Sequence, residues 1–460
     1  MIGISQLRYE ERTASEHVVP RAGMLHTPVG VFEAPAIMPS LRTLTDWKAV
    51  HLNIEKGLRV GIISPYASEA DSFGPEFSDY FWPAQTKLLD SMVPSPLVLA
   101  DIESEALNFN GKARQNYLRL DRPMGDPVGR GRRTDAMDLL METGTYTDAD
   151  YGTRESHAAW NKMLEEYGPG PLMDWTERHL AAVRSSVLFV PTPILRKDER
   201  SVESALEIAK VLLPVARRKT RFKMHGIHLL LQDTLFDSST RASKARVALK
   251  KGVRALALDQ GTRDIFLSIK IDDRGVLSDR EHGRIARVNL SNLLVDLHQS
   301  IQLSNGVLVA FNVGNWALGY LDSGVDVAGV RLTGKPVIDR IFRGRKGEKH
   351  DFDVPPLTMW RSMSDEPYEV VRTYYEENDH AFPVPTCMDP EPYWGFSPRD
   401  QWKYVARAKC GVFVNVGEEY REAVEDSSKP LRDAVMSRIN DSGMKQELAD
   451  LSPSVRVDGA

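Results

Sequence analysis

Short apolar runs alternate with longer amphipathic segments along much of the chain. The runs place Val, Ile and Leu at consecutive positions, which is typical of parallel strands buried on both faces. We predict strands at Pro35–Met38, Val60–Ile63, Leu97–Ala100, Val187–Val190, Gly226–Leu231, Val253–Leu258, Val307–Phe311 and Val325–Val330. Amphipathic periodicity predicts helices at Ser201–Lys219, Thr240–Lys251 and Asn289–Gln302, and Gly252 is expected to end the second of them.

Eight strands with helical crossovers predict the α/β fold class and, within it, a (β/α)8 TIM barrel. About 85 residues separate the third and fourth predicted strands, which is too long for a simple crossover. We therefore predict a long insertion after strand 3, over about residues 102–186. After about Lys346 the alternation stops and prolines cluster. This change predicts a barrel domain of residues 1–345 and a smaller appended C-terminal domain of residues 346–460.

The charge balance is mildly acidic. The 460 residues include 59 Lys and Arg and 64 Asp and Glu, so the formal net charge is −5. A nucleic-acid partner would therefore have to be bound through local basic runs. One such run follows the eighth predicted strand, and its side chains Arg343, Arg345 and Lys346 are predicted to contact a nucleic-acid backbone.

Neither a signal peptide nor a membrane span is expected. The first residues carry charges of both signs and have no apolar core. No stretch approaches the roughly 18–20 apolar residues that cross a bilayer. We expect a soluble, cytoplasmic protein without a membrane partner.

The segment from Arg21 to Pro39 reads RAGMLHTPVGVFEAPAIMP. Its Gly, Thr-Pro, Gly and Pro-Ala-x-Met-Pro positions resemble the opening of the tRNA-guanine transglycosylase family, in which a hairpin precedes the first barrel strand. Similar segments follow in the family's order at residues 62–67, 96–101, 189–193, 225–232, 312–314 and 323–326. The resemblance covers roughly residues 20–340, with 102–186 unmatched. It implies a barrel enzyme that exchanges guanine for a 7-deazaguanine derivative in a polynucleotide.

The resemblance also implies roles for individual residues. Asp101 ends a segment similar to the strand that carries a catalytic Asp, and Gln232 ends one similar to the strand whose Gln contacts the base. Base exchange needs a carboxylate that attacks C1′ of the sugar and an acidic group that handles protons. Asp259 and Gly261 follow the sixth predicted strand, and we predict that they help to bind the base. Barrel sites lie at the carboxyl ends of the strands, where these residues should converge.

The chain departs from the family's pattern at several places. The family's base-recognition Asp is replaced by Val190 or Pro191, and Gly329 stands where the nucleophilic Asp is expected. Asp326 is the nearest carboxylate to that position and is a second candidate catalytic residue. The structural alternatives are a helix cap for Asp101, an amide satisfied by loop groups for Gln232, and turn residues for the other two aspartates.

Two cysteines cannot form the family's cysteine-rich zinc site or a disulfide framework, and they fit a reducing compartment. Cys387 and Cys410 with His350 and His380 offer four zinc-binding side chains, but their spacing matches no compact zinc pattern. The alternative is that the cysteines are packed as apolar residues. No cofactor is predicted, and zinc is left open.

Three hypotheses for the function follow. The first is base exchange in DNA or tRNA, with a 7-deazaguanine base as the second substrate. The second is a catalytically degenerate family member that binds nucleic acid, or that acts as a homodimer or as the partner of a catalytic subunit. The third is a barrel enzyme acting on a small nucleoside or base.

Overall fold

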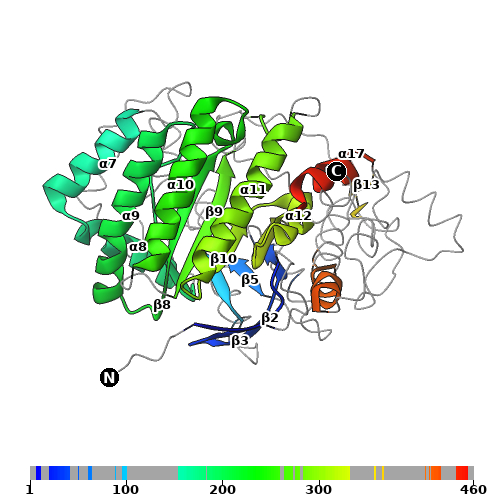
Figure 1. Ribbon diagram of the computed structural model, residues 1–460. Coiled ribbons are helices and arrows are strands. Elements are labelled where there is room, and N and C mark those ends of the chain that lie inside the picture. The colour runs from blue at the N-terminus through cyan, green and yellow to red at the C-terminus, as the bar shows by residue number, and fades with distance from the viewer. Residues whose placement is uncertain are drawn as a thin grey trace, which may run out of the picture.

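The computed structural model describes a little more than half of the chain. Its residues are 7–11, 20–41, 50, 61–64, 89, 96–100, 154–182, 184–259, 264–272, 275–279, 283–331, 357–358, 365–366, 410, 414, 416–425 and 442–453. They form an α/β fold in which helices pack on a parallel sheet (Figure 1). None of the helices in these ranges is long and apolar enough to cross a membrane.

Eight strands of the described residues form one sheet. They are β4 (Ala36–Ser40), β5 (Ile62–Ser64), β6 (Val98–Ala100), β7 (Val187–Val190), β8 (Met224–Gln232), β9 (Ile265–Asp272), β10 (Val307–Phe311) and β11 (Val327–Arg331). Their order is β6-β5-β4-β11-β10-β9-β8-β7, and every ladder is parallel. The last strand in sequence, β11, therefore lies beside the first, β4.

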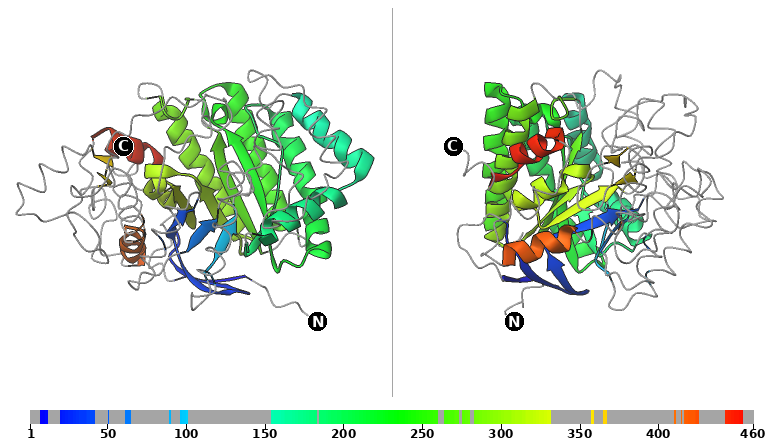
Figure 2. Two further views of the ribbon diagram at one scale, coloured as in Figure 1. Left: turned by 180° about the vertical axis from the view of Figure 1, so that it is seen from behind. Right: turned by 90° about the vertical axis from the view of Figure 1, so that its right-hand side faces the viewer.

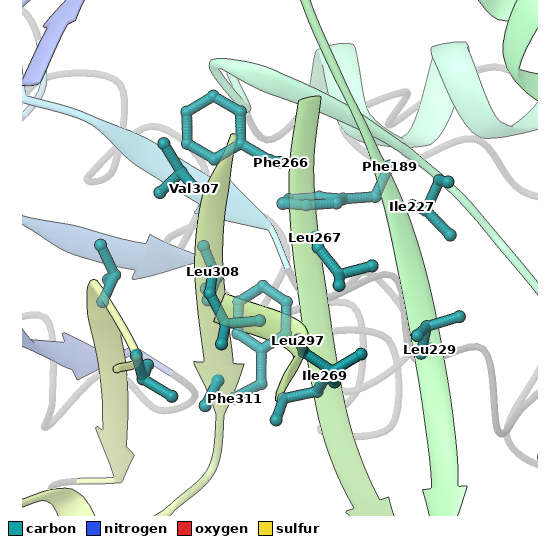
Figure 3. Close-up of a cluster of buried hydrophobic side chains, with 14 of the residues drawn as sticks. Phe189, Ile227, Leu229, Phe266, Leu267, Ile269, Leu297, Val307, Leu308 and Phe311 are labelled. Carbon is teal, nitrogen blue, oxygen red and sulfur yellow. The ribbon is translucent and has the colours of Figure 1, made fainter. Parts of the chain in front are cut away.

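The sheet is strongly curved. The rings of Phe189 on β7 and Phe311 on β10 have centroids 5.9 Å apart, although β8 and β9 lie between these strands. Three strand spacings in a flat sheet would be about 14 Å. The sheet therefore curls toward the face that carries these rings, and Figure 3 shows the aromatic side chains within the buried cluster.

Between β6 and β7, at the two ends of this order, the described residues form no ladder. In the described ranges, hydrogen bonds between Ser186 and Val98 join the two ends: the backbone N–H of Ser186 donates to Val98 O over 2.7 Å, and the Val98 N–H donates to Ser186 Oγ over 3.1 Å. The α/β class is thus confirmed, while closure into a barrel stays a prediction.

Three long helices cover the convex face of β7–β10. They are α9 (Glu199–Lys219), α10 (Thr240–Leu258) and α11 (Gly283–Gln302), and they lie side by side in both Figure 1 and Figure 2. Their buried residues recur at helical spacing, as an amphipathic helix on a sheet requires. Ser239 caps α10, since its hydroxyl accepts a hydrogen bond from the backbone N–H of Ala242.

The predicted strand Val253–Leu258 is wrong, because these residues are the last turns of α10. A short apolar run fits a buried helix face as well as a buried strand. Gly252 does not end the helix. It lies where α10 approaches α9, and a Cβ at this position would be 2.1 Å from Leu206 Cδ1. The sixth strand is β9. The other seven predicted strands and the three helices are confirmed, and all of them except β7 and β10 have shifted bounds.

The described end of the predicted insertion consists of two helices, α7 (Arg154–Tyr167) and α8 (Gly170–Ala182). Trp160, Leu172 and Leu180 are fully buried and belong to the same hydrophobic cluster as the sheet. These helices therefore pack with the main fold. The start of the insertion lies outside the described residues.

A small antiparallel sheet precedes β4. It consists of β1 (Arg8–Glu11), β2 (Gly23–Thr27) and β3 (Gly30–Ala34). Thr27 Oγ1 donates to Gly30 O over 2.9 Å and stabilises the turn between β2 and β3. The hairpin implied by the resemblance is confirmed in the structure.

The described residues near the C-terminus pack onto the same core. Helix α17 (Ser442–Leu451) contacts α11 and α12 (Ala317–Asp322). Arg287 and Asp450 form a buried ion pair over 2.8 Å, and Tyr420, in the helical residues 416–425, donates to Asp322 Oδ1 over 3.2 Å. The predicted boundary near residue 345 lies outside the described residues, as does most of 346–460, where the structure describes only a short pair, β12 (Leu357–Thr358) and β13 (Asp365–Glu366), before residue 410.

Gly226 on β8 provides a test of this packing. A Cβ there would lie 2.5 Å from the carbonyl oxygen of Phe266 and 2.7 Å from the ring of Phe189. We expect Gly226→Ala to lower the free energy of unfolding by about 1–3 kcal/mol, because the neighbouring strand backbone cannot move aside. Urea denaturation measures the loss. Gly170→Ala, whose Cβ would meet the mobile end of Lys219, is the control; an equal loss in both variants would contradict the explanation.

Candidate functional site

Polar side chains gather at the carboxyl ends of β8 and β9. Successive residues of a strand alternate between the two faces, and register partners on parallel strands share a face. Two register pairs are His228 with Ser268 and Gln232 with Asp272. Lys270 lies between Ser268 and Asp272 on the same face of β9. The concave face of the sheet therefore becomes polar toward its carboxyl edge.

The innermost of these polar residues are His228 and Ser268. Both are fully buried, and His228 Nδ1 lies 2.8 Å from Ser268 Oγ. The His228 ring packs at 5.7 Å from the ring of Phe311. Thr192, in the loop after β7, donates to His228 O over 2.8 Å. These contacts hold the His228 side chain and backbone in place below the carboxyl ends of the strands.

Lys270 and Asp272 are charged residues in a buried setting. Their exposed fractions are 1% and 4%. Burying a charged group costs free energy unless partners or a ligand compensate, which makes these two residues candidates for a site. Their position at the carboxyl edge is where α/β folds bind ligands.

Gln232 is held at the end of β8 by two hydrogen bonds. Its Oε1 accepts a hydrogen bond from Thr234 Oγ1 over 2.9 Å, and its backbone N–H donates to Leu195 O over 2.9 Å. Among the described residues, no group accepts a hydrogen bond from Gln232 Nε2. That amide group is a candidate hydrogen-bond donor for a ligand at this edge.

Asp233 links the two strand ends. It is fully buried, and its Oδ2 accepts a hydrogen bond from the backbone N–H of Val276 over 2.7 Å. Val276 follows Asp272 by four residues, so this contact ties the segment after β9 to the end of β8. Asp233 is a positioning residue for the edge.

Asp259 does not lie with Gln232. It is the exposed C-cap of α10, and its backbone N–H donates to Ala255 O over 3.2 Å. A crossover helix runs antiparallel to the strands, so its end lies at their amino edge. The predicted placement of Asp259 at a strand end is wrong, because the preceding residues are helical. Gly261 lies outside the described residues.

Asp326 lies at the start of β11, also at the amino edge. Its side chain is 1% exposed and accepts hydrogen bonds from Arg21 Nε over 2.9 Å, from Arg21 Nη2 over 3.2 Å and from the Leu308 N–H over 2.8 Å. Arg21 Nη2 also donates to Gly306 O over 2.6 Å. This network gives Asp326 a structural role, at the edge opposite to Gln232.

The other predicted site residues, Asp101, Arg343, Arg345 and Lys346, lie outside the described residues. Of the four side chains considered for zinc, only Cys410 is described, and it is buried. Within the described ranges, no three His, Cys, Asp or Glu side chains are grouped so as to hold a metal ion.

Sequence reasoning missed Lys270 and Asp272 because the sixth strand was predicted too early. The signal was present in the residues Ile265–Asp272, in which Ser268, Lys270 and Asp272 alternate with apolar positions. Such alternation predicts a strand with one apolar and one polar face. With that strand assigned, its carboxyl end would have identified Asp272.

Comparison with protein families and with curated proteins found no match for this chain.

Proposed function

We propose that this chain is a transglycosylase-like barrel enzyme that replaces guanine by a 7-deazaguanine derivative in DNA or tRNA. The support is that seven segments that carry the family resemblance in sequence lie on, or directly beside, strands of one parallel sheet, in the family's order. The observation that carries the proposal is Gln232, which ends β8 at the carboxyl edge of the sheet, where the resemblance implies a Gln that contacts the base.

Barrel closure is part of the proposal. Strands that follow one another in the chain are neighbours in the sheet at every step except from β6 to β7, and β11 pairs with β4, as the eighth and first strands of a (β/α)8 barrel do. The remaining junction lies between β6 and β7, where Ser186 and Val98 share two hydrogen bonds. The contact between Phe189 and Phe311 supports the curvature that closure needs.

The proposed chemistry is a double displacement. A carboxylate attacks C1′, the bond from C1′ to N9 of guanine breaks, and its electron pair leaves with the base, which takes up a proton. The incoming base loses its N9 proton, attacks C1′ and displaces the carboxylate. The two proton transfers balance. Asp101, the residue after β6, is assigned to the two proton transfers. The attacking carboxylate is left unassigned, because Gly329 stands at the place of the family's nucleophile and Asp326 lies in an ion pair at the opposite edge.

Asp101→Asn tests this mechanism. We expect the variant to lose about 10²–10⁴-fold in the rate of labelled-guanine incorporation into duplex DNA or tRNA, because an amide cannot donate and take up a proton as a carboxyl group does. Both polymers are assayed with wild-type and variant protein of equal thermal stability. Incorporation that is unchanged in the variant would remove Asp101 from the mechanism.

A second candidate function is a non-catalytic member that binds nucleic acid or partners a catalytic subunit. It is favoured by the structural role of Asp326 and by Gly329, which stands at the place of the family's nucleophile. Binding of either polymer by the wild type, without exchange, would support this candidate over the enzyme.

A further inference from the structure

We infer that the outer surface of helix α10 is a docking surface for the phosphate backbone of duplex DNA. This surface, the α10 face, consists of the exposed cations Arg241, Lys244, Lys251 and Arg254. It belongs to the outer layer of helices and not to the concave face that carries Gln232. The inference therefore does not depend on base exchange.

Helix α10 carries positive charge alone. Its 19 residues include six Lys and Arg and no Asp or Glu, in a chain that has 59 Lys and Arg and 64 Asp and Glu. Two of the six have partners: Lys250 forms an ion pair with Asp296, and Arg246 donates to Asp237 O over 3.1 Å. The four cations of the α10 face form no ion pair or hydrogen bond with another described residue. Their charge is available to a partner.

The charges of α10 do not serve the helix itself. Arg241 lies in the first turn, where the helix dipole favours acidic residues, and the last turn carries no basic residue. Arg241 and Lys244 are three positions apart, as are Lys251 and Arg254, so like charges are neighbours and weaken the helix. Glutamate forms helices about as well as lysine and would pair with these cations. An external anion accounts for a set of charges that the helix alone disfavours.

The four cations form a row along the molecule. Helix α10 lies between α9 and α11 on the convex face of the sheet (Figure 1). Lys244, Lys251 and Arg254 lie within about 80° of one another around the helix axis, and Arg241 is about 60° from Lys244. At about 1.5 Å per residue, the row is about 20 Å long. A straight, charged backbone can therefore lie along it.

Duplex DNA is the polyanion that fits this row best. It carries one negative charge per about 1.7 Å of its axis, so phosphates lie along the whole row. Single strands stack their bases on aromatic side chains, whereas the large exposed apolar residues of the described chain are Val, Leu and Ile. Double-stranded RNA is recognised through its 2′-hydroxyl groups, but the α10 face offers charges. A membrane would take up an apolar helix face, and that of α10 is packed on the sheet.

The test is binding of the purified full-length chain to a duplex made only of A·T pairs, which contains no guanine to exchange. Arg241→Gln, Lys244→Gln, Lys251→Gln and Arg254→Gln are combined in one protein, the α10 variant. We expect it to bind about 10²–10³-fold more weakly than wild type at about 0.1 M salt. The slope of log K against log salt concentration should be smaller by about 3–4, because each lost phosphate contact removes about 0.9. Fluorescence anisotropy at several salt concentrations measures both quantities.

Three controls make the result specific. Arg8→Gln, Lys197→Gln, Lys210→Gln and Lys223→Gln together remove the same charge from exposed positions outside α10, and this protein should keep the wild-type slope. Arg241→Lys with Arg254→Lys preserves the charge of the α10 face and should keep it too. The α10 variant should unfold at a temperature no lower than wild type, because neighbouring like charges are removed.

The outcomes separate this inference from base exchange. Wild-type protein that does not bind the A·T duplex, or an equal loss in the α10 variant and the charge-matched control, overturns the inference. Binding of tRNA or of phosphatidylserine vesicles in place of the duplex also overturns it. A loss confined to the α10 variant supports the inference whether or not guanine is exchanged. Wild-type protein that binds the duplex but exchanges no guanine in DNA or tRNA removes the proposed base exchange alone.

Discussion

Replacing Asp326 by alanine will lower the free energy of unfolding by about 3–5 kcal/mol, the usual cost of removing one partner of a buried ion pair. The loss arises because the Arg21 guanidinium, 6% exposed, would be left charged and without its carboxylate. Burial alone lowers the pKa of Arg21, but the adjacent Asp326 more than offsets this and raises the pKa above its ordinary value. In the variant this support is lost, but the guanidinium still keeps its proton, because arginine is not deprotonated in proteins.

The Arg21 side chain is also fixed by its neighbours. Its guanidinium stacks 3.9 Å from the centre of the Tyr9 ring, and the Tyr9 hydroxyl donates to Arg21 O over 3.0 Å. The network thus joins β1 to the starts of β10 and β11. Burial and the charge of Asp326 raise the pKa of Tyr9, which keeps its hydroxyl protonated as a donor.

Chemical denaturation of wild type, Asp326→Ala, Arg21→Met and the double variant measures the effect. The double variant should recover part of the loss, because both buried charges are then gone. Lys197→Met, which breaks the exposed pair with Asp237, should change stability by less than about 1 kcal/mol. If Asp326→Ala is as stable as wild type but has lost base exchange, Asp326 is a catalytic residue and its structural role is wrong.

Much of the sheet was predictable from the residues alone. Runs such as Val187–Val190 and Val307–Phe311 are strands with the predicted bounds. They are buried on both faces, so nearly every position is apolar and the signal is local. The hairpin before β4 was equally predictable, because Thr27 and Gly30 meet the requirements of a tight turn.

The polar residues at the carboxyl ends of β8 and β9 were harder to predict, because the register of these two strands brings them together. Gln232 was identified through the resemblance, whereas Asp272 is its partner only after β8 and β9 are paired. The apolar run Val253–Leu258 was predicted as the sixth strand, although it is the end of α10. Gly252 was predicted to end that helix, but it lies inside the helix, where α9 and α10 approach closely. Asp326 could be located from sequence, but its pairing with Arg21 spans 305 positions and depends on tertiary structure.

Acid will destabilise the protein between about pH 6.5 and pH 4, through two buried histidines. Burial, followed by the charge of Arg217, lowers the pKa of His225 from 6.5 to about 4. Burial, only partly offset by the hydrogen bond to Ile194 O, lowers the pKa of His157 from 6.5 to about 4. At pH 4, linkage gives a loss on the order of 3 kcal/mol for each residue.

The sign follows from proton binding. Below pH 6.5 the unfolded chain takes up protons at both histidines, whereas the folded chain stays neutral there until the pH approaches 4. The unfolded state thus binds more protons, and stability falls as the pH decreases. Above pH 6.5 neither state is charged at these positions, and their contribution to stability is fully present.

The hydrogen bonds explain why the folded protein resists protonation. His157 Nε2 lies 3.1 Å from Ile194 O and must donate to it, so a second proton would go to Nδ1, which is buried and has no partner among the described residues. His225 Nε2 lies 3.2 Å from Thr220 Oγ1, whose own proton is directed to Ala216 O.

Glutamine can replace the Nε2 donor of either ring without titrating. His157→Gln and His225→Gln should each flatten the dependence of unfolding free energy on pH between 7.5 and 4, while His26→Gln at an exposed position is the control. Denaturation curves at four pH values across this range measure it, and an unchanged slope in the double variant would mean that carboxylates, and not these histidines, set the acid limit of the fold.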